Sequence, residues 1–307
     1  MSYKIEPIPA PIVTLGEGPH WDIERQSLYF VDIYPGNIFR YDYNEKKTYS
    51  CKVSKEEMVS FIIPIKGTSD KFAVGVGRRV GIVKWDGYTD NCTIEKILFQ
   101  VETEPEFLKN RFNDAKIDPR GRLYAGTMRL ETLGEDLFAQ QKGSFYKFDN
   151  GKVEKLFSNV GISNGLTWNE KAKKFYYIDS TALNITQYDY DIETGKIGKP
   201  QVLIDFRNNG ERPNFVPDGM TIDKNGFLYV ATYGGAKILI VNPKNGQTES
   251  EIEFPCDQIT SAAFGGPSLD ILYVTTSNMG DKPAPAGTTY KVTGLGPVGL
   301  PMNNMQI

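Results

Sequence analysis

The chain has 307 residues, 40% of them hydrophobic and 24% charged, and a formal charge of -3 at pH 7. This balance is typical of a globular protein and lacks the basic footprint of a nucleic-acid-binding protein. No run of apolar residues is long enough to span a bilayer, and the N-terminal segment with Lys4 and Glu6 lacks the apolar core of a signal peptide. We therefore expect a cytoplasmic protein whose partner is a small-molecule substrate, with no nucleic acid, no membrane and no obligate protein partner.

The three cysteines, Cys51, Cys92 and Cys256, are odd in number and lie far apart in the sequence. Neither property suits the paired disulfide framework of a small secreted protein. Reduced thiols with a structural role are therefore expected.

One strand pattern recurs in six copies along the chain. Each copy has a strand of apolar and aromatic residues, a tight turn, and a second strand that ends in an aromatic residue followed by Asp, Asn or Gly. The copies span residues 26–42, 70–87, 121–151, 173–191, 226–243 and 270–294. A short strand precedes each copy, and these strands begin near residues 18, 60, 113, 164, 218 and 260. The resulting period of about 42 to 54 residues is typical of a propeller blade.

A six-bladed β-propeller is the fold that this repeat predicts. Four-stranded blades leave two raw edges unless the ring closes, and exposed edges promote aggregation. We expect residues 1–307 to form a single propeller domain, with residues 4–14 closing the last blade. The alternative, a β-sandwich with a second domain, requires a linker or a break in composition, and neither is found.

Polar residues at the starts of the inner strands are expected to converge on a central channel. Glu17, Asn164 and Asp218 fall at the same phase of three repeats. Two carboxylates and an amide oxygen suit one divalent cation, such as Ca²⁺, Mg²⁺ or Mn²⁺, and carboxylates bind Zn²⁺ as well. Taken singly, the Asn-Gly and Asp-Gly pairs are ordinary turn dipeptides, so the shared phase carries the prediction.

A second group of candidate residues lies in "KNRFNDAKIDPRGRLYAGTM", residues 109–128. On an extended segment, Arg111 and Asn113 face one way while Phe112 packs the other way. A guanidinium beside an amide can bind the hydroxyl or carbonyl oxygens of a polar ligand. The alternative is a surface arginine that pairs with Asp114 or Asp118.

His20, the only histidine, restricts the chemistry more than it suggests a role. A three-histidine zinc site is excluded, and no Ser-His-Asp motif of the usual form surrounds it. The glycine-rich stretch "GVGRRVG", residues 75–81, lacks the Lys-Ser/Thr end of a phosphate-binding loop. We expect His20 to be structural.

The blocks "GEGPHW", "NRFNDAKIDPRGRLYAGTM", "ISNGLTW", "PDGMTID" and "ITSAAFGGPSLDILYVTTS" occur in this order over essentially the whole chain. In these blocks the chain resembles the senescence marker protein, or regucalcin, family, which includes gluconolactonases and the firefly luciferin-regenerating enzyme, and it looks most like insect members. The resemblance implies a propeller with one divalent metal in its channel, held by Glu17, Asn164 and Asp218. It also implies that Arg111, Asn113 and Glu131 contact the substrate. The divergent segment after Glu131, "TLGEDLFAQQKG", is where a lid over the channel is expected.

The activity that the resemblance implies is metal-dependent hydrolysis of sugar-type lactones, of the gluconolactonase or regucalcin type. Asp218 is the expected general base and Glu17 chiefly a ligand. Two alternatives stay open. One is a luciferin-regenerating enzyme that acts on oxyluciferin, and the other is a non-catalytic, calcium-binding regulatory protein. Because the sequence contains no EF-hand loop, a calcium role must use the same channel site.

Overall fold

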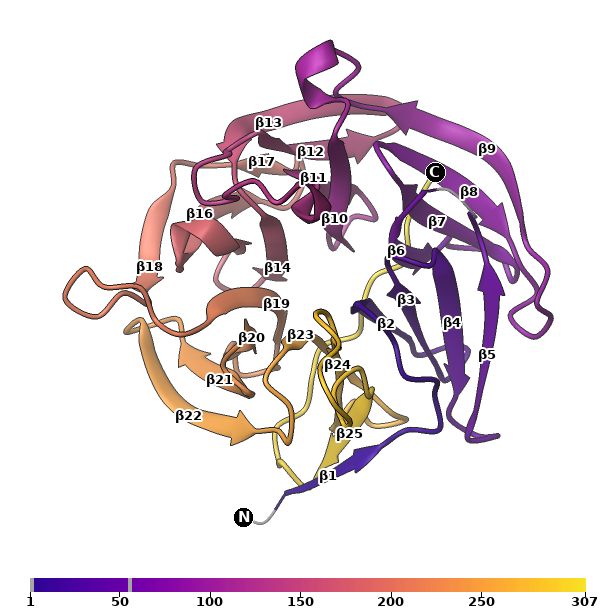
Figure 1. The fold of residues 1–307 in the computed structure, drawn as a ribbon. Helices are drawn as coiled ribbons and strands as arrows, with labels where there is room; N and C mark the ends of the chain where they lie inside the picture. The colour runs from indigo at the N-terminus through magenta and orange to yellow at the C-terminus, as the bar shows by residue number, and fades with distance from the viewer. Residues whose placement is uncertain (1–2, 55–56) are drawn as a thin grey trace.

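The computed structural model describes residues 3–54 and 57–307. These residues form six antiparallel sheets arranged as blades around a central axis (Figure 1). The prediction of an all-β, six-bladed propeller is confirmed. Within the described residues, the helical segments are three single 3-10 turns: η1 (Pro105–Phe107), η2 (Glu131–Leu133) and η3 (Ser180–Ala182). None of them is long and apolar enough to cross a membrane.

The first three blades run from the centre outward in chain order. Blade 1 contains β2 (Gly16–Asp22), β3 (Ser27–Asp32), β4 (Asn37–Asp42) and β5 (Lys47–Lys52). Blade 2 contains β6 (Val59–Pro64), β7 (Lys71–Val76), β8 (Arg79–Lys84) and β9 (Thr93–Gln100). Blade 3 contains β10 (Asn110–Ile117), β11 (Leu123–Arg129), β12 (Gly143–Asp149) and β13 (Lys152–Val160).

The last three blades follow the same plan with two variations. Blade 4 contains β14 (Ser163–Asn169), β15 (Lys174–Asp179) and β16 (Asn184–Asp191), and both β17 (Lys196–Ile197) and β18 (Gln201–Asp205) pair with β16. Blade 5 contains β19 (Val216–Ile222), β20 (Leu228–Tyr233), β21 (Lys237–Asn242) and β22 (Gln247–Glu253). Blade 6 contains β23 (Ile259–Gly265), β24 (Ile271–Thr276) and β25 (Tyr290–Thr293), with β1 (Lys4–Pro7) as its outermost strand. Sequence-distant strands therefore share one sheet, with Lys4 opposite Thr293.

The Asp that ends the third strand of several blades shapes the turn that follows it. In blade 1, Oδ1 of Asp42 accepts hydrogen bonds from the backbone N–H groups of Asn44 (2.9 Å) and Glu45 (3.0 Å). In blade 4, Asp191 accepts the N–H of Glu193 in the same way at 2.9 Å. Asp side chains favour such turns because they replace the missing ladder bonds. This chemistry explains the aromatic-Asp ending that recurs in the sequence.

The hydrophobic core lies between the blades. Among the described residues, apolar clusters fill each of the six gaps between consecutive blades. Trp21 of blade 1 stacks on Tyr273 of blade 6 with ring centroids 5.4 Å apart, which shows that the last gap is filled like the others. Both faces of blade 1 pack on neighbouring blades, so β3 is buried along its whole length.

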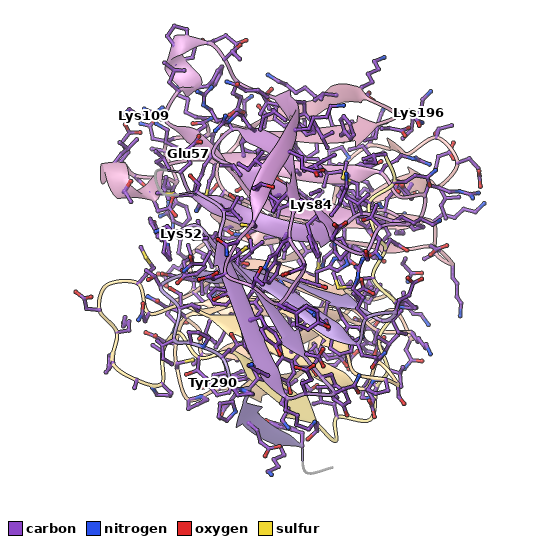
Figure 2. All side chains as sticks on the ribbon, turned by 90° about the vertical axis from the view of Figure 1, so that its right-hand side faces the viewer. Lys52, Glu57, Lys84, Lys109, Lys196 and Tyr290 are labelled. Carbon is purple, nitrogen blue, oxygen red and sulfur yellow. The ribbon has the colours of Figure 1, made fainter. Side chains whose placement is uncertain are left out.

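The inner strands surround a channel with two different mouths. Each inner strand contacts the inner strand of the next blade, from β2 through β23 and back to β2. At one mouth, residues 295–307 cross behind the centre in the view of Figure 1, and Gly299 and Met305 form bridges to Asp223 and Ile65. Figure 2 views the propeller from its side, with Lys109 and Lys196 toward opposite faces. β10 starts next to Lys109, so the inner strands start on the Lys109 face. The C-terminal segment crosses the other mouth, where the inner strands end, and leaves the mouth on the Lys109 face uncovered.

Candidate functional site

The three predicted ligand residues lie on the inner strands of three blades: Glu17 on β2, Asn164 on β14 and Asp218 on β19. We predicted that each would precede its strand, whereas the structure places each inside its strand, where the pairing register shifts. Asn164 and Asp218 each begin a β-bulge, and Glu17 is the last paired residue before one. All three directly precede a glycine, and Glu17 follows Gly16↔Asp32 as Asn164 follows Ser163↔Asp179, so they keep the same position in their blades. Bulges re-aim side chains, which directs these three into the channel.

The glycines that follow Asn164 and Asp218 allow close approach of the inner strands. A Cβ on Gly165 would lie 2.7 Å from the backbone oxygen of Asp218, and a Cβ on Gly219 would lie 2.4 Å from Cβ of Ser261. Any larger residue would push these strands apart. The Asn-Gly and Asp-Gly pairs are thus packing features of the channel and not tips of surface turns.

A single cavity of about 220 Å³ is lined by all six predicted site residues. It lies at the uncovered mouth, among the starts of inner strands and the ends of second strands. Its polar lining consists of Glu17, Arg111, Asn113, Glu131, Asn164, Ser180 and Asp218. Its apolar and aromatic lining consists of Leu15, Met128, Leu137, Ile162, Val216, Tyr233 and Met279. The structure therefore brings the predicted ligand residues and the predicted substrate-contacting residues into one site.

Three buried carboxyl groups crowd the polar side of this site. Burial raises the pKa of Glu17 to about 8, and the charge of Asp114 adds to the shift. Burial also raises the pKa of Asp218 well above its ordinary value, with Glu17 and Asp114 as further causes. The pKa of Asp114 is raised by burial, although Lys116 opposes the shift. Crowded acids of this kind are stabilised in their ionised form by a nearby positive charge.

A directed chain of hydrogen bonds fixes the amide of Asn164. The Arg111 guanidinium, which can only donate, bonds Oδ1 of Asn113 at 2.7 Å. Nδ2 of Asn113 then donates to Oδ1 of Asn164 at 3.2 Å. Nδ2 of Asn164 donates to Oγ of Ser180 at 2.8 Å, and the Ser180 hydroxyl donates to the backbone oxygen of Pro217 at 2.6 Å. Because the direction is set from Arg111, the oxygen of the Asn164 amide faces Asn113 and its nitrogen faces Ser180.

Arg111 also forms a buried ion pair with Glu131. Its Nε and Nη2 atoms bond the two carboxylate oxygens of Glu131 at 3.2 and 2.5 Å. Burial opposes ionisation of Glu131, but the Arg111 charge and hydrogen bond hold its pKa below the ordinary value. The alternative, a surface arginine paired with Asp114 or Asp118, does not hold, since the Arg111 side chain is only 3% exposed and pairs with Glu131.

The residues of this cavity fit a hard divalent cation. Oδ1 of Asp218 is buried and has no hydrogen-bond partner among the described residues. Among all the residues that the structure describes, no group of three or more His, Cys, Asp or Glu side chains is arranged to hold a metal ion. A cation bound here would therefore use an amide oxygen, and Asn164 supplies one with acceptor capacity to spare. Oxygen ligands from Glu17, Asn164 and Asp218 match the preference of hard cations.

Several of the residues that line the cavity were not predicted from the sequence. Ser180 and Tyr233 follow or end second strands, and Leu137 lies in the divergent segment after Glu131. Only the sequence position of Leu137, within the expected lid, pointed to the channel. Phe138, its neighbour, packs under the Arg212 guanidinium, 3.8 Å from its ring centre. This contact joins the segment to the loop before β19.

His20 does not line the cavity. It is 2% exposed, and its Nε2 atom lies 3.2 Å from Oδ1 of Asn304 in the C-terminal segment. Burial lowers its pKa to about 4, although the Asn304 contact opposes the shift. These contacts agree with the structural role expected from the sequence.

The low pKa of His20 predicts a specific acid sensitivity. Because the folded pKa lies below the ordinary value of 6.5, the stabilisation is complete above about pH 6.5 and is lost as the pH falls toward about 4. A shift of this size corresponds to about 3 kcal/mol. The free energy of unfolding of His20→Gln, measured by denaturant titration, is therefore expected to fall less than that of the wild type between pH 7 and pH 4.5. Parallel losses in both proteins would contradict this account.

Comparison with known proteins agrees with this geometry. The family model described as "SMP-30/Gluconolactonase/LRE-like region" matches residues 15–278. Regucalcin of Gallus gallus is 34% identical over an alignment of 308 positions, which covers 98% of this chain and 97% of that protein. The structure of a luciferin-regenerating enzyme superposes with a TM-score of 0.90 and 36% identity, with full coverage of both chains. A calcium-binding protein, regucalcin, from Agrobacterium tumefaciens superposes with a TM-score of 0.84 over 98% of this chain and 97% of its own, and its 22% identity supports the fold alone.

The matched region contains Glu17, Arg111, Asn113, Glu131, Asn164 and Asp218, so every predicted site residue lies within it. The fold, the convergence of the inner strands and the sequence similarity over nearly the full length all support the same family assignment. This chain belongs to the SMP-30/gluconolactonase/LRE-like family.

Proposed function

We propose that the protein is a hydrolase of lactones that depends on one divalent cation, Ca²⁺, Mg²⁺, Mn²⁺ or Zn²⁺. The observation that carries the proposal is the pair of buried carboxyl groups, Glu17 and Asp218, beside the oriented amide of Asn164. These groups line a cavity that is also lined by the Arg111–Glu131 ion pair. Such a site suits a small neutral ester better than a macromolecule.

Each of these side chains has a separate role in the proposed reaction. A bound divalent cation would supply a positive charge that polarises the lactone carbonyl and lowers the pKa of a water molecule. The Asp218 carboxylate, whose Oδ1 lacks a hydrogen-bond partner within the described residues, is the proposed acceptor of the proton from the attacking water. Glu17, held by the N–H of Gly18 at 3.0 Å, is chiefly a ligand. Arg111 and Glu131 line the cavity and would orient the substrate.

Ser180 is proposed to position Asn164 through the hydrogen bond to its amide nitrogen. Ser180→Ala removes that bond and is expected to weaken cation binding about 10- to 100-fold, the usual effect of losing such a supporting contact. Calorimetric titration of the chelated protein with Ca²⁺ or Mn²⁺ measures this change. Ser60→Ala is the matched control, since the Ser60 hydroxyl is also buried and donates to a backbone oxygen, that of Phe112, at 2.5 Å. Equal affinities of Ser180→Ala and the control would contradict the role.

Two other functions are compatible with family membership, and one assay separates them. A calcium-binding protein without turnover would bind the cation and hydrolyse no lactone. An enzyme of the luciferin-regenerating type would act on oxyluciferin, and the apolar part of the cavity lining gives this candidate some support. Rates measured on a panel of lactones and on oxyluciferin, after chelation and after cation is added back, distinguish all three.

A further inference from the structure

We propose that Cys51 and Cys92 form a redox-reactive dithiol, which hydrogen peroxide oxidises to a disulfide bond between two neighbouring blades. In the structure both side chains are free thiols. Neither lines the channel cavity, so this site is separate from the proposed lactone hydrolysis.

The packing of blades 1 and 2 brings the two thiols together. Cys51 lies on β5, the outermost strand of blade 1, and is only 3% exposed. Cys92 comes directly before β9, the outermost strand of blade 2, and is half-buried. Cys51 belongs to the apolar cluster that fills the gap between these blades, and Cys92 packs against the same cluster. Two residues that are distant in the sequence therefore meet at one seam of the propeller.

Two contacts hold Cys92 beside Cys51. The Cys51 thiol forms a hydrogen bond with the Cys92 side chain. The Cys92 sulfur also lies 3.5 Å from the backbone oxygen of Lys52, the residue that follows Cys51. A disulfide requires two side chains that already point toward each other at short range. Thiols in direct contact meet this requirement with little movement of the backbone.

The two thiols differ in reactivity in the way that a two-step oxidation requires. The hydrogen bond from Cys51 lowers the pKa of the Cys92 thiol, although burial opposes the shift. The same hydrogen bond raises the pKa of Cys51, and burial and the charges of Asp86 and Asp90 add to that shift. The thiolate is the form that attacks peroxide, and the more exposed sulfur is the one that peroxide reaches. Cys92 is therefore the first nucleophile and Cys51 the second thiol.

The reaction has two steps. The Cys92 thiolate attacks one oxygen of hydrogen peroxide, the O–O bond breaks, and a sulfenic acid forms on Cys92 while the departing hydroxide takes up a proton as water. The Cys51 sulfur then attacks the Cys92 sulfur, the S–S bond forms and the S–O bond breaks. The departing hydroxide takes the Cys51 proton and leaves as a second water. Two thiols thus supply the two electrons that reduce one peroxide.

The experiment identifies the oxidised thiols in the full-length protein. The reduced protein is treated with a small molar excess of hydrogen peroxide, alkylated with iodoacetamide in denaturant, and digested for mass spectrometry. A disulfide between the peptides of Cys51 and Cys92 is expected, and dithiothreitol is expected to restore both thiols. Retention of all three thiols, a disulfide between separate chains, or oxidation of Cys92 to sulfinic acid without a disulfide overturns the proposal.

Cys256 is the control within the same chain. It is buried between blades 5 and 6, and burial raises the pKa of its thiol. Because thiolate content and exposure set the rate of oxidation, Cys92 is expected to react about tenfold or more faster than Cys256. Equal rates at Cys92 and Cys256 overturn the proposal.

Three variants test the order of the two steps. In Cys51→Ala the sulfenic acid on Cys92 has no second thiol to attack it, so labelling of Cys92 by dimedone is expected to rise about tenfold over the wild type. In Cys92→Ser, which changes only the half-buried partner, Cys51 is expected to stay reduced. Cys256→Ala is the matched control and is expected to form the disulfide as the wild type does. Loss of the Cys51 thiol in Cys92→Ser at the wild-type rate overturns the proposal, as does unchanged dimedone labelling in Cys51→Ala.

Discussion

Replacing Asp218 by Asn is expected to remove lactone hydrolysis while the fold stays intact. Asn matches Asp in size but carries no charge, so the variant cannot accept a proton at this position and binds a cation less tightly. General acid–base catalysis alone contributes about 10² to 10⁴ in rate, and kcat is expected to fall by at least that factor. Because Asp218 is crowded by Glu17 and Asp114, the metal-free variant is expected to be at least as stable as the wild type.

Asp114→Asn is the matched control for this prediction. Asp114 is equally buried and its pKa is also raised by burial, but it does not line the cavity. Its replacement removes a charge that raises the pKa of Asp218 but removes no side chain from the cavity. The expected change in kcat is therefore less than about tenfold, which corresponds to a pKa shift of about one unit. Lactone hydrolysis by Asp218→Asn within tenfold of the wild-type rate would sink the assignment of Asp218 as general base.

Replacing Arg111 by Met is expected to produce the largest loss of stability. The change removes one partner of a buried ion pair, which typically costs about 3 to 5 kcal/mol, because Glu131 is left without a counter-charge. It also removes the first donor of the chain that orients Asn113 and Asn164. We expect a matching decrease in the free energy of unfolding, measured by guanidinium titration, together with weaker cation binding.

Arg129→Met is the control that shows how much of the stability loss depends on burial of the ion pair. Arg129 pairs with Glu135 through the same two atom types, Nε at 3.0 Å and Nη2 at 3.3 Å, only a few residues away from Glu131. Its side chain and that of Glu135 are 16% and 33% exposed, compared with 3% and 20% for Arg111 and Glu131. The more exposed pair is expected to contribute only about 1 kcal/mol or less. Equal losses in the two variants would show that burial of the Arg111 pair has no special weight.

Sequence alone predicted the architecture because the repeated pattern has a direct physical cause. The Asp that ends the third strand of a blade, such as Asp42 or Asp191, makes the turn to the outermost strand. Its recurrence at a regular spacing therefore indicates the number of blades. The shared phase of Glu17, Asn164 and Asp218 in these repeats likewise predicted that they would meet in one place, as they do.

Other features of the site left no periodic signal. The register shifts at Glu17, Asn164 and Asp218 depend on strand pairing, which a sequence pattern does not display. Ser180 acts from a 3-10 turn outside the inner strands, and Leu137 and Met279 come from connecting segments of unequal length. Such contributions depend on how loops fold over the channel, and the repeat does not specify them.

The central claim is that one cation, bound by Glu17, Asn164 and Asp218, is required for lactone hydrolysis. The most direct test measures cation stoichiometry and kcat/KM on the same chelated preparation of wild type and of Glu17→Gln as Mn²⁺ or Ca²⁺ is added back. The account predicts that wild-type activity returns in step with binding of one cation per chain, and that Glu17→Gln needs far more cation for the same recovery. Full activity in the chelated protein, or recovery in Glu17→Gln at the wild-type cation concentration, would contradict it.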